Sequence, residues 1–449
     1  MVRSALTAAL RGALRLFFRR IEVVGRERVP PTGPTLFAIN HPNGLIDPLL
    51  LLCFAPRPVS FLGKAPLFRM PVIGWLARTF DSIPVHRRQE GGTDPARNQE
   101  TFARARALLE RGGTLAIAPE GTSHSDPKLR PIKTGAARIA LGAATGTPVA
   151  IVPVGLFYTE KAVFRSSALI VFGEAIRGPA TGTAPTGEPA PEEVNRLTAA
   201  IEIGLASLVP QADDHDAHQL VTRAERLLTA ALPDPRARTL DDRLVVRQRL
   251  LAGYRTLRDR EPVLLDRLIR RVDRLDRAFQ TAGLSPDALP STPPRVAAIP
   301  RALGRLLVRV GGFVPLAVPG VVIHYPAYRL IGWVARVVAG EHDDVLATVK
   351  IIAAALFYPV TWVAVGAAVG WWLGWPFGVG AALLAPLSGY AALRLVERFG
   401  RFLSATRALG FYLFEPEHFG RLAAEREALR HDLLALADRL GAGAETASR

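Results

Sequence analysis

A polar turn, Asn40-His41-Pro42-Asn43-Gly44-Leu45-Ile46-Asp47-Pro48, lies between two short apolar runs. An apolar run that leads into such a turn indicates a buried strand that ends beside it. His41 and Asp47 are six positions apart, and Gly44 allows a turn tight enough for their side chains to meet. A carboxylate that holds one ring nitrogen of an imidazole leaves the other nitrogen to accept a proton. The spacing alone is weak evidence, since turn histidines and helix-capping aspartates are commoner than catalytic pairs.

Composition limits the class of protein. With 449 residues, the chain is long enough for a catalytic core and about one or two further modules. Its 56 Lys+Arg against 40 Asp+Glu give a net charge of +16, which favours nucleic acid or anionic lipid as a partner. Nearly half of the residues are apolar, so we expect membrane lipid and no nucleic acid. The single cysteine, Cys53, excludes an internal disulfide and a multi-cysteine zinc site.

Residues 21–180 alternate between short apolar runs and helix-like segments, which predicts an α/β domain whose sheet is covered by helices. No Gly-x-Gly-x-x-Gly or phosphate-loop motif follows a strand there, which argues against dinucleotide and nucleoside triphosphate chemistry. The predicted strands are Ile21–Val24, Thr35–Asn40, Val59–Leu62, Ser82–Val85, Thr114–Ala118, Val149–Val154 and Leu169–Phe172.

The remaining segments are predicted to be helical. Residues 1–20 carry leucines at helical spacing among arginines, which indicates an amphipathic helix on a membrane surface or one packed on its own domain; we favour the first. Residues 181–300 form a charged helical region. Residues 301–345 are expected to form interfacial helices, because their apolar run, Val310–Ile323, is short and is interrupted by Pro315 and Pro319. Residues 401–449 are expected to form a soluble helix.

Residues 346–400 are predicted to form a transmembrane helical hairpin. Ile351 to Leu393 contains no charged residue, and a turn at Gly374-Trp375-Pro376 divides it into two crossings. The alternative is a buried pair of helices in a soluble protein. Basic residues at both ends place them in the cytoplasm, and we therefore expect an inner (cytoplasmic) membrane protein whose catalytic domain faces the cytoplasm. These residues are Lys350, Arg394, Arg398 and Arg401.

Three further stretches accompany predicted strands of the α/β domain. They are Ile83-Pro84-Val85-His86-Arg87, Ala118-Pro119-Glu120-Gly121-Thr122-Ser123 and Ile151-Val152-Pro153-Val154. Loops at strand ends converge on one crevice of an α/β sheet, so these stretches and the turn at His41 are expected to share a site. Because no serine or cysteine nucleophile stands beside His41, the reaction expected is direct attack of a substrate alcohol on an activated acyl group.

In order and spacing, the four stretches resemble the four sequence blocks of the glycerophospholipid acyltransferases, over residues 21–176. Together with the apolar hairpin, they look most like the fungal-type glycerol 3-phosphate and dihydroxyacetone phosphate acyltransferases and their bacterial relatives. The resemblance implies acyl transfer from acyl-CoA or acyl-carrier protein to a glycerol phosphate or lysophospholipid acceptor. It implies no cofactor, and it leaves open which of glycerol 3-phosphate, dihydroxyacetone phosphate and 1-acylglycerol 3-phosphate is the acceptor.

The resemblance also assigns roles to single residues. His41 is expected to be the general base, with Asp47 orienting it, and Arg87 is expected to bind the phosphate of the acceptor. The other substrate-binding residues that it implies are Glu120, Gly121, Thr122, Ser123 and Lys133.

The chain departs from the family pattern in three places. Five residues, not four, separate His41 from Asp47, Ser123 stands where the family has arginine, and Asp81 replaces the glycine that opens the second block. Two alternatives were weighed: His86 and His124 as metal ligands, and a non-catalytic membrane protein that binds lipid or acts as a scaffold. We favour an enzyme without a metal, because the block residues of the reaction are present.

Overall fold

The computed structural model describes residues 2–86, 95–143, 147–178, 189–230, 239–286, 314–340 and 342–447. Two compact units make up the chain. The first unit consists of Met1–His215 with Glu341–Thr348, and the second consists of Asp216–Gly340 with Val349–Arg449.

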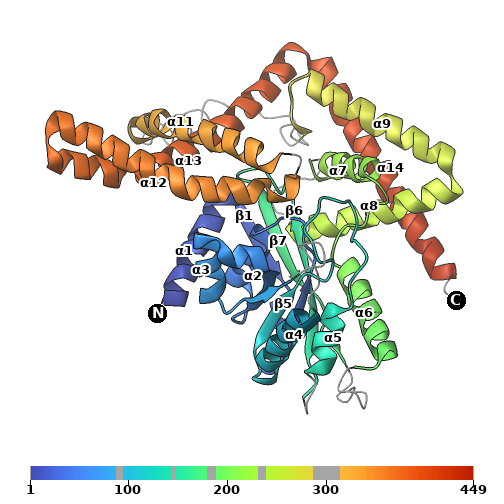
Figure 1. Cartoon of the computed structure of the whole chain (residues 1–449). Coiled ribbons are helices and arrows are strands. Elements are labelled where there is room, and N and C mark those ends of the chain that lie inside the picture. The colour runs from blue at the N-terminus through green and yellow to red at the C-terminus, as the bar shows by residue number, and fades with distance from the viewer. Residues whose placement is uncertain are drawn as a thin grey trace. The chain divides into compact units, whose positions relative to one another are not determined.

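A mixed, mostly parallel sheet forms the centre of the first unit (Figure 1). Its strand order is β1-β7-β6-β2-β5-β3-β4, with β8 paired to β6, and only the pairings of β6 with β7 and β8 are antiparallel. All seven predicted strands are present, and the predicted α/β class is confirmed. The strands are β1 (Arg20–Val24), β2 (Thr35–Ile39), β3 (Ser60–Lys64), β4 (Ile83–Val85), β5 (Thr114–Ile117), β6 (Ala150–Tyr158), β7 (Ser167–Phe172) and β8 (Ile176–Arg177).

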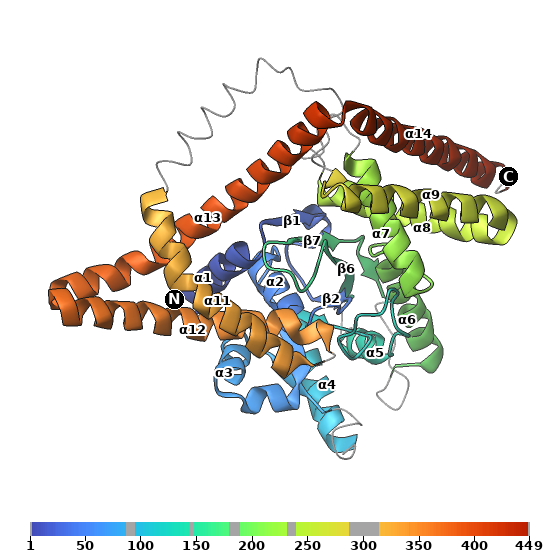
Figure 2. The ribbon, with the colours of Figure 1, turned by 90° about the horizontal axis from the view of Figure 1, so that it is seen from above.

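Helices cover both faces of this sheet, as Figures 1 and 2 show. Every residue of β2 is buried, because helices cover the parallel sheet on both faces. This burial explains why the strand is an almost continuous apolar run in the sequence. Leu36 and Ala38 of β2 pack in a core with α4, α5 and α6. The helices of this unit are α1 (Val2–Phe17), α2 (Ile46–Phe54), α3 (Pro71–Thr79), α4 (Pro95–Glu110), α5 (Gly135–Gly142) and α6 (Pro191–Ala206), with short 3-10 helices η1 (Arg26–Arg28) and η2 (Ala65–Arg69).

Two helices differ from their predicted surroundings. The α6 helix, which the boundary at 180 assigns to the charged region, buries Val194, Leu197 and Ile201 in the core of the sheet. Its apolar residues recur at helical spacing, so it covers the sheet like the preceding helices. The face of α1 expected to lie on a bilayer packs instead on the protein itself: Leu14 and Phe17 are buried, and α1 contacts α2.

In the described residues of the second unit, the secondary-structure elements are all helices. Helices α8 and α9 lie in the segment predicted to be a charged helical region and contact each other, and a capping box at Thr239 begins α8. The α11 helix runs through Pro319 and Pro326, so the expected interruption of this apolar segment does not occur. The elements are α7 (His215–Ala230), α8 (Leu240–Arg260), α9 (Pro262–Thr281), α11 (Val314–Ala339), α12 (Asp343–Leu373), α13 (Trp375–Phe414) and α14 (Pro416–Ala447).

The predicted turn between two long apolar helices lies at Gly374. The α12 helix ends at Leu373, α13 begins at Trp375, and Gly374 between them has a φ of +98°, which favours glycine. Asp343–Leu373 and Trp375–Gly400 are the two described segments that are long and apolar enough to cross a membrane. Their apolar side chains are mostly exposed; Trp371, for example, is 89% exposed. So large an apolar surface indicates an interaction with lipid or with another protein.

Candidate active site

The site begins where three parallel neighbours of the sheet end. Strand β2 lies between β5 and β6 and is parallel to both, so the loops that follow these strands emerge at the same edge. Asn40 joins two of these ends: its amide donates to the Leu156 carbonyl at 3.0 Å and accepts from the Leu156 N–H at 2.7 Å. Asn40, the first residue of the turn that carries His41, therefore fixes this turn to β6.

His41 and Asp47 meet across the turn. His41 Nδ1 lies 2.9 Å from Asp47 Oδ2, and the two side chains are 15% and 0% exposed. Gly44 has a φ of +34°, and the Asn43 carbonyl accepts from the Ile46 N–H at 2.9 Å, so the fifth intervening residue fits within the turn. An ionised carboxylate only accepts hydrogen bonds, so Nδ1 carries the hydrogen and Nε2 is left as a proton acceptor.

Two further donors hold the Asp47 carboxylate. The Asn43 N–H donates to Oδ2 at 2.7 Å, and the hydroxyl of Tyr158, the last residue of β6, donates to Oδ1. Burial, and next the Asp47 charge, raise the pKa of Tyr158 well above its ordinary value. Tyr158 therefore stays protonated as a donor, and the buried carboxylate is oriented on both of its oxygens.

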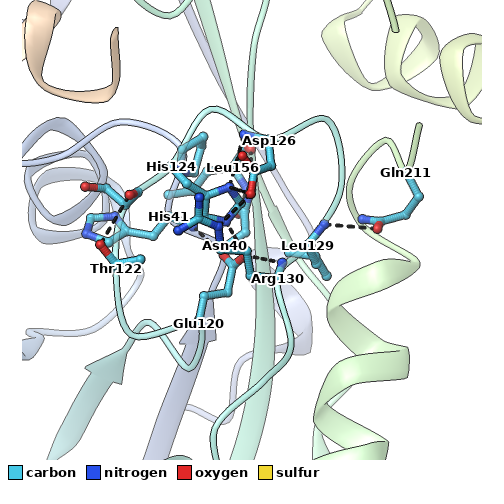
Figure 3. Close-up of polar contacts among 12 residues, drawn as sticks. Asn40, His41, Glu120, Thr122, His124, Asp126, Leu129, Arg130, Leu156 and Gln211 are labelled. Carbon is cyan, nitrogen blue, oxygen red and sulfur yellow. Dashed lines mark hydrogen bonds and ion pairs between the residues drawn. The ribbon is translucent and has the colours of Figure 1, made fainter. Parts of the chain in front are cut away.

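Glu120 joins the loops that follow β2 and β5. One carboxylate oxygen accepts from the His41 N–H at 3.1 Å, and the other accepts from the Arg130 N–H at 2.8 Å and contacts His124 Nε2. Figure 3 shows His41, Glu120 and His124 side by side. Because Glu120 is fully buried and both oxygens face protein donors, these contacts suit the positioning of His41 better than direct binding of substrate.

The loop after Glu120 is fixed by its own hydrogen bonds. His124 donates its backbone N–H to the His41 carbonyl at 3.2 Å, and its Nδ1 accepts from the Asp126 N–H at 3.2 Å. The Arg130 guanidinium donates to Asp126 Oδ2 at 2.6 Å, which lowers the pKa of Asp126 and raises that of Arg130. His124 thus connects the two loops through its backbone and its ring.

The other expected binding residues lie around this loop. Gly121 has a φ of +81°, and the Lys133 side chain lies so close that a Cβ would stand 2.5 Å from Nζ. Thr122 and Ser123 are half-buried, and Lys133 is exposed. Arg87 lies outside the described residues.

Sequence reasoning missed Tyr158 and Lys161. Lys161 donates to the Pro42 carbonyl at 3.0 Å and to Ser125 Oγ at 2.6 Å, so it joins the same two loops from the segment after β6. Burial lowers the pKa of its ammonium, in opposition to nearby aspartates that include Asp344 and Asp47. Tyr158 lies four residues beyond the predicted strand Val149–Val154, so the sequence carries no local signal for it.

The described residues contain no group of three or more His, Cys, Asp or Glu side chains that is arranged to hold a metal ion. His124, one of the two histidines weighed as a metal ligand, has both ring nitrogens facing groups of the protein.

Comparison with known proteins identifies the class. Residues 20–156 match the family described as Acyltransferase, and residues 221–443 match the glycerol-3-phosphate acyltransferase 2 C-terminal domain. Over these residues the chain is thus similar to acyltransferases, and it is a homologue of glycerol-3-phosphate O-acyltransferases.

Individual relatives agree with these matches. Saccharomyces cerevisiae glycerol-3-phosphate O-acyltransferase 2 is 30% identical over 59% of this chain and 37% of its own length. Glycerol-3-phosphate O-acyltransferase 1 of the same yeast is 25% identical over 80% of this chain and 60% of its own length. A chloroplastic 1-acyl-sn-glycerol-3-phosphate acyltransferase from Brassica napus is 32% identical over 32% of this chain and 39% of its own length. The matches therefore span 37% to 60% of the length of these relatives.

Among solved structures, the 1-acyl-sn-glycerophosphate acyltransferase PlsC from Thermotoga maritima matches with a TM-score of 0.34 and 21% identity, over 46% of this chain and 80% of that one.

Proposed function

We propose that this chain is a membrane-bound glycerol-3-phosphate acyltransferase that takes its acyl group from acyl-CoA or acyl-carrier protein. The observation that carries the proposal is the 2.9 Å contact of His41 Nδ1 with buried Asp47, which leaves Nε2 as a base. The described homology to two yeast glycerol-3-phosphate O-acyltransferases supports this acceptor. The second candidate is 1-acylglycerol 3-phosphate, which the Brassica relative supports.

The mechanism proposed is a direct transfer. A hydroxyl of the acceptor attacks the carbonyl carbon of the donor thioester while His41 Nε2 takes the hydroxyl proton. Asp47 stabilises the imidazolium that forms, as a carboxylate does in a catalytic triad. The tetrahedral intermediate collapses to the ester, the carbon–sulfur bond breaks, and the imidazolium returns the proton to the leaving thiolate. Backbone donors near Glu120 to Thr122 are proposed to stabilise the oxyanion.

Membrane attachment is proposed to be through α12 and α13. Both helices have the length and hydropathy of a crossing, and their apolar side chains are mostly exposed. The basic residues at both ends of the pair favour the cytoplasmic side for the catalytic unit, on the inner (cytoplasmic) membrane. A net charge of +16 suits attraction to an anionic lipid surface.

The experiment is an acyl-transfer assay with the purified full chain in detergent. It uses acyl-CoA and acyl-carrier protein as donors, and glycerol 3-phosphate, dihydroxyacetone phosphate and 1-acylglycerol 3-phosphate as acceptors. We expect transfer to glycerol 3-phosphate, and His41→Ala should lower the rate by about two to four orders of magnitude, the usual contribution of a general base. His431→Ala, which removes an exposed histidine of α14, is the control and should retain full activity.

Two results would contradict the assignment: a wild type that transfers to none of the three acceptors, or His41→Ala with near-normal turnover. The first would favour the non-catalytic alternative, a membrane protein that binds lipid or acts as a scaffold. A preference for 1-acylglycerol 3-phosphate would show that the second candidate acceptor is the correct one.

Arg87 is proposed to bind the acceptor phosphate, as the family resemblance implies. In the same assay, Arg87→Ala should raise the KM for the phosphate-bearing acceptor about tenfold or more and leave the KM for the donor unchanged, because a charge-assisted contact of about 1.5–3 kcal/mol is lost. The neighbouring Arg88→Ala is the matched control. An unchanged acceptor KM in Arg87→Ala would contradict this role and would mean that other cationic groups bind the phosphate.

A further inference from the structure

The first turn of α12 belongs to the first unit, far along the chain from the catalytic turn. The Leu45 N–H donates to Thr348 Oγ1 at 3.1 Å, across 303 positions of sequence. Beside it, Gly44 lies so close to this helix that a Cβ would stand 2.9 Å from the Asp344 carbonyl oxygen. The turn between His41 and Asp47 therefore rests directly on the start of α12.

The N-terminal end of α12 also contacts the second loop of the site. Ser123 Oγ donates to Asp344 Oδ2 at 2.5 Å, and Asp344 is 9% exposed. Asp344 stands in the first turn of α12, where the helix dipole favours a carboxylate side chain.

We propose that Asp344 and Thr348 are positioning residues for acyl transfer: from the first two turns of α12 they hold the loops of His41 and Glu120 in place relative to each other. The inference rests on the proposed function. Lys161 braces the same two loops through Pro42 and Ser125. Geometry this close to the base matters, because small displacements of a catalytic group lower the rate strongly.

The test compares variants of the full chain in the acyl-transfer assay. Asp344→Ala and Ser123→Ala should each lower kcat about tenfold and change the acceptor KM less than twofold, because the pair orients the loops without binding substrate. The double variant should be no slower than either single one, since both remove the same hydrogen bond. Asp344→Asn should restore at least half of kcat, because its amide oxygen still accepts from Ser123. Asp343→Ala removes an exposed carboxylate of the same turn and is the control.

Singles with wild-type kcat, or losses that add in the double variant, would overturn the inference while leaving acyl transfer established. Hydrogen exchange gives a readout that needs no turnover. Asp344→Ala and Thr348→Val should speed exchange in peptides covering 40–47 and 120–130, but not in β6. Unchanged exchange at both loops would also overturn the inference. A wild type without acyl transfer would instead defeat the proposed function, and the exchange result would then decide the positioning separately.

Discussion

Asp47 is a fully buried carboxyl group, and burial of such a group is costly unless hydrogen-bond donors surround it. Tyr158 supplies one of them, and Tyr158→Phe deletes only that hydroxyl. A hydrogen bond to a buried charge contributes about 1.5–3 kcal/mol, so we expect a lower thermal midpoint at pH 7–8. We also expect kcat to fall about tenfold, because Asp47 no longer holds His41 as firmly. Tyr325→Phe, at an exposed tyrosine, is the control and should change neither quantity.

The pH dependence of the Tyr158 contribution has a definite sign. The pKa of Tyr158 in the folded chain lies well above its ordinary value of 10.0, so above about pH 10 the unfolded chain loses this proton first. The stabilisation is fully present below pH 10 and is lost as pH rises toward the folded pKa. The difference in thermal midpoint between wild type and Tyr158→Phe should therefore narrow above pH 10. A difference that stays constant from pH 8 to 11 would contradict this account.

At the residue scale, what the sequence predicts depends on distance along the chain. His41 and Asp47 stand in one turn, and their contact follows from local geometry and a glycine. The Tyr158 partner is 111 positions from Asp47, and the Thr348 partner is 303 positions from Leu45. Such contacts depend on strand order and on where β6 ends, and the predicted β6 stops at Val154, four residues before Tyr158. No local pattern carries that information.

At the scale of elements, small residues let α12 and α13 approach closely. A Cβ on Gly378 would stand 2.6 Å from the Gly366 carbonyl oxygen and 2.8 Å from Gly370 Cα, whereas a Cβ on Gly380 would meet nothing within 4 Å. Gly378→Ala should therefore separate the helices and lower the thermal midpoint of the full chain in detergent. Gly380→Ala should keep or raise it, because alanine is a better helix former by about 1 kcal/mol. Equal effects of the two variants would show that the helices do not pack here.

Helices and strands with a clear hydropathy pattern were predictable from the sequence, but the elements against which they pack were not. The apolar runs of the sheet and the uncharged hairpin follow from hydropathy alone, and glycine at 374 marks the turn. Amphipathicity does not specify a partner: α1 uses its leucine face against α2, although the same face would suit a bilayer. Pro319 likewise does not interrupt α11, since a proline inside a helix removes one hydrogen bond without having to end the helix.

At the scale of the whole molecule, the excess of positive charge and the apolar hairpin together predict one orientation in the membrane. Both ends of the hairpin carry basic residues, so both should remain on the cytoplasmic side and the turn at Gly374 should lie on the other. The native Cys53 is buried, and burial raises its pKa to about 11, so this thiol should react slowly at neutral pH. Single cysteines introduced elsewhere can therefore report on topology.

Trp372→Cys and Arg407→Cys form a matched pair of exposed positions. Trp372 stands beside the turn, and Arg407 lies in α13 beyond its apolar segment Trp375–Gly400. In sealed right-side-out vesicles, a membrane-impermeant maleimide should label Trp372→Cys and spare Arg407→Cys, and inside-out vesicles should give the reverse pattern. The wild type, which contains only Cys53, supplies the background. Labelling of both positions from the same side would mean that the hairpin does not cross the bilayer, and its exposed apolar surface would then require a protein partner.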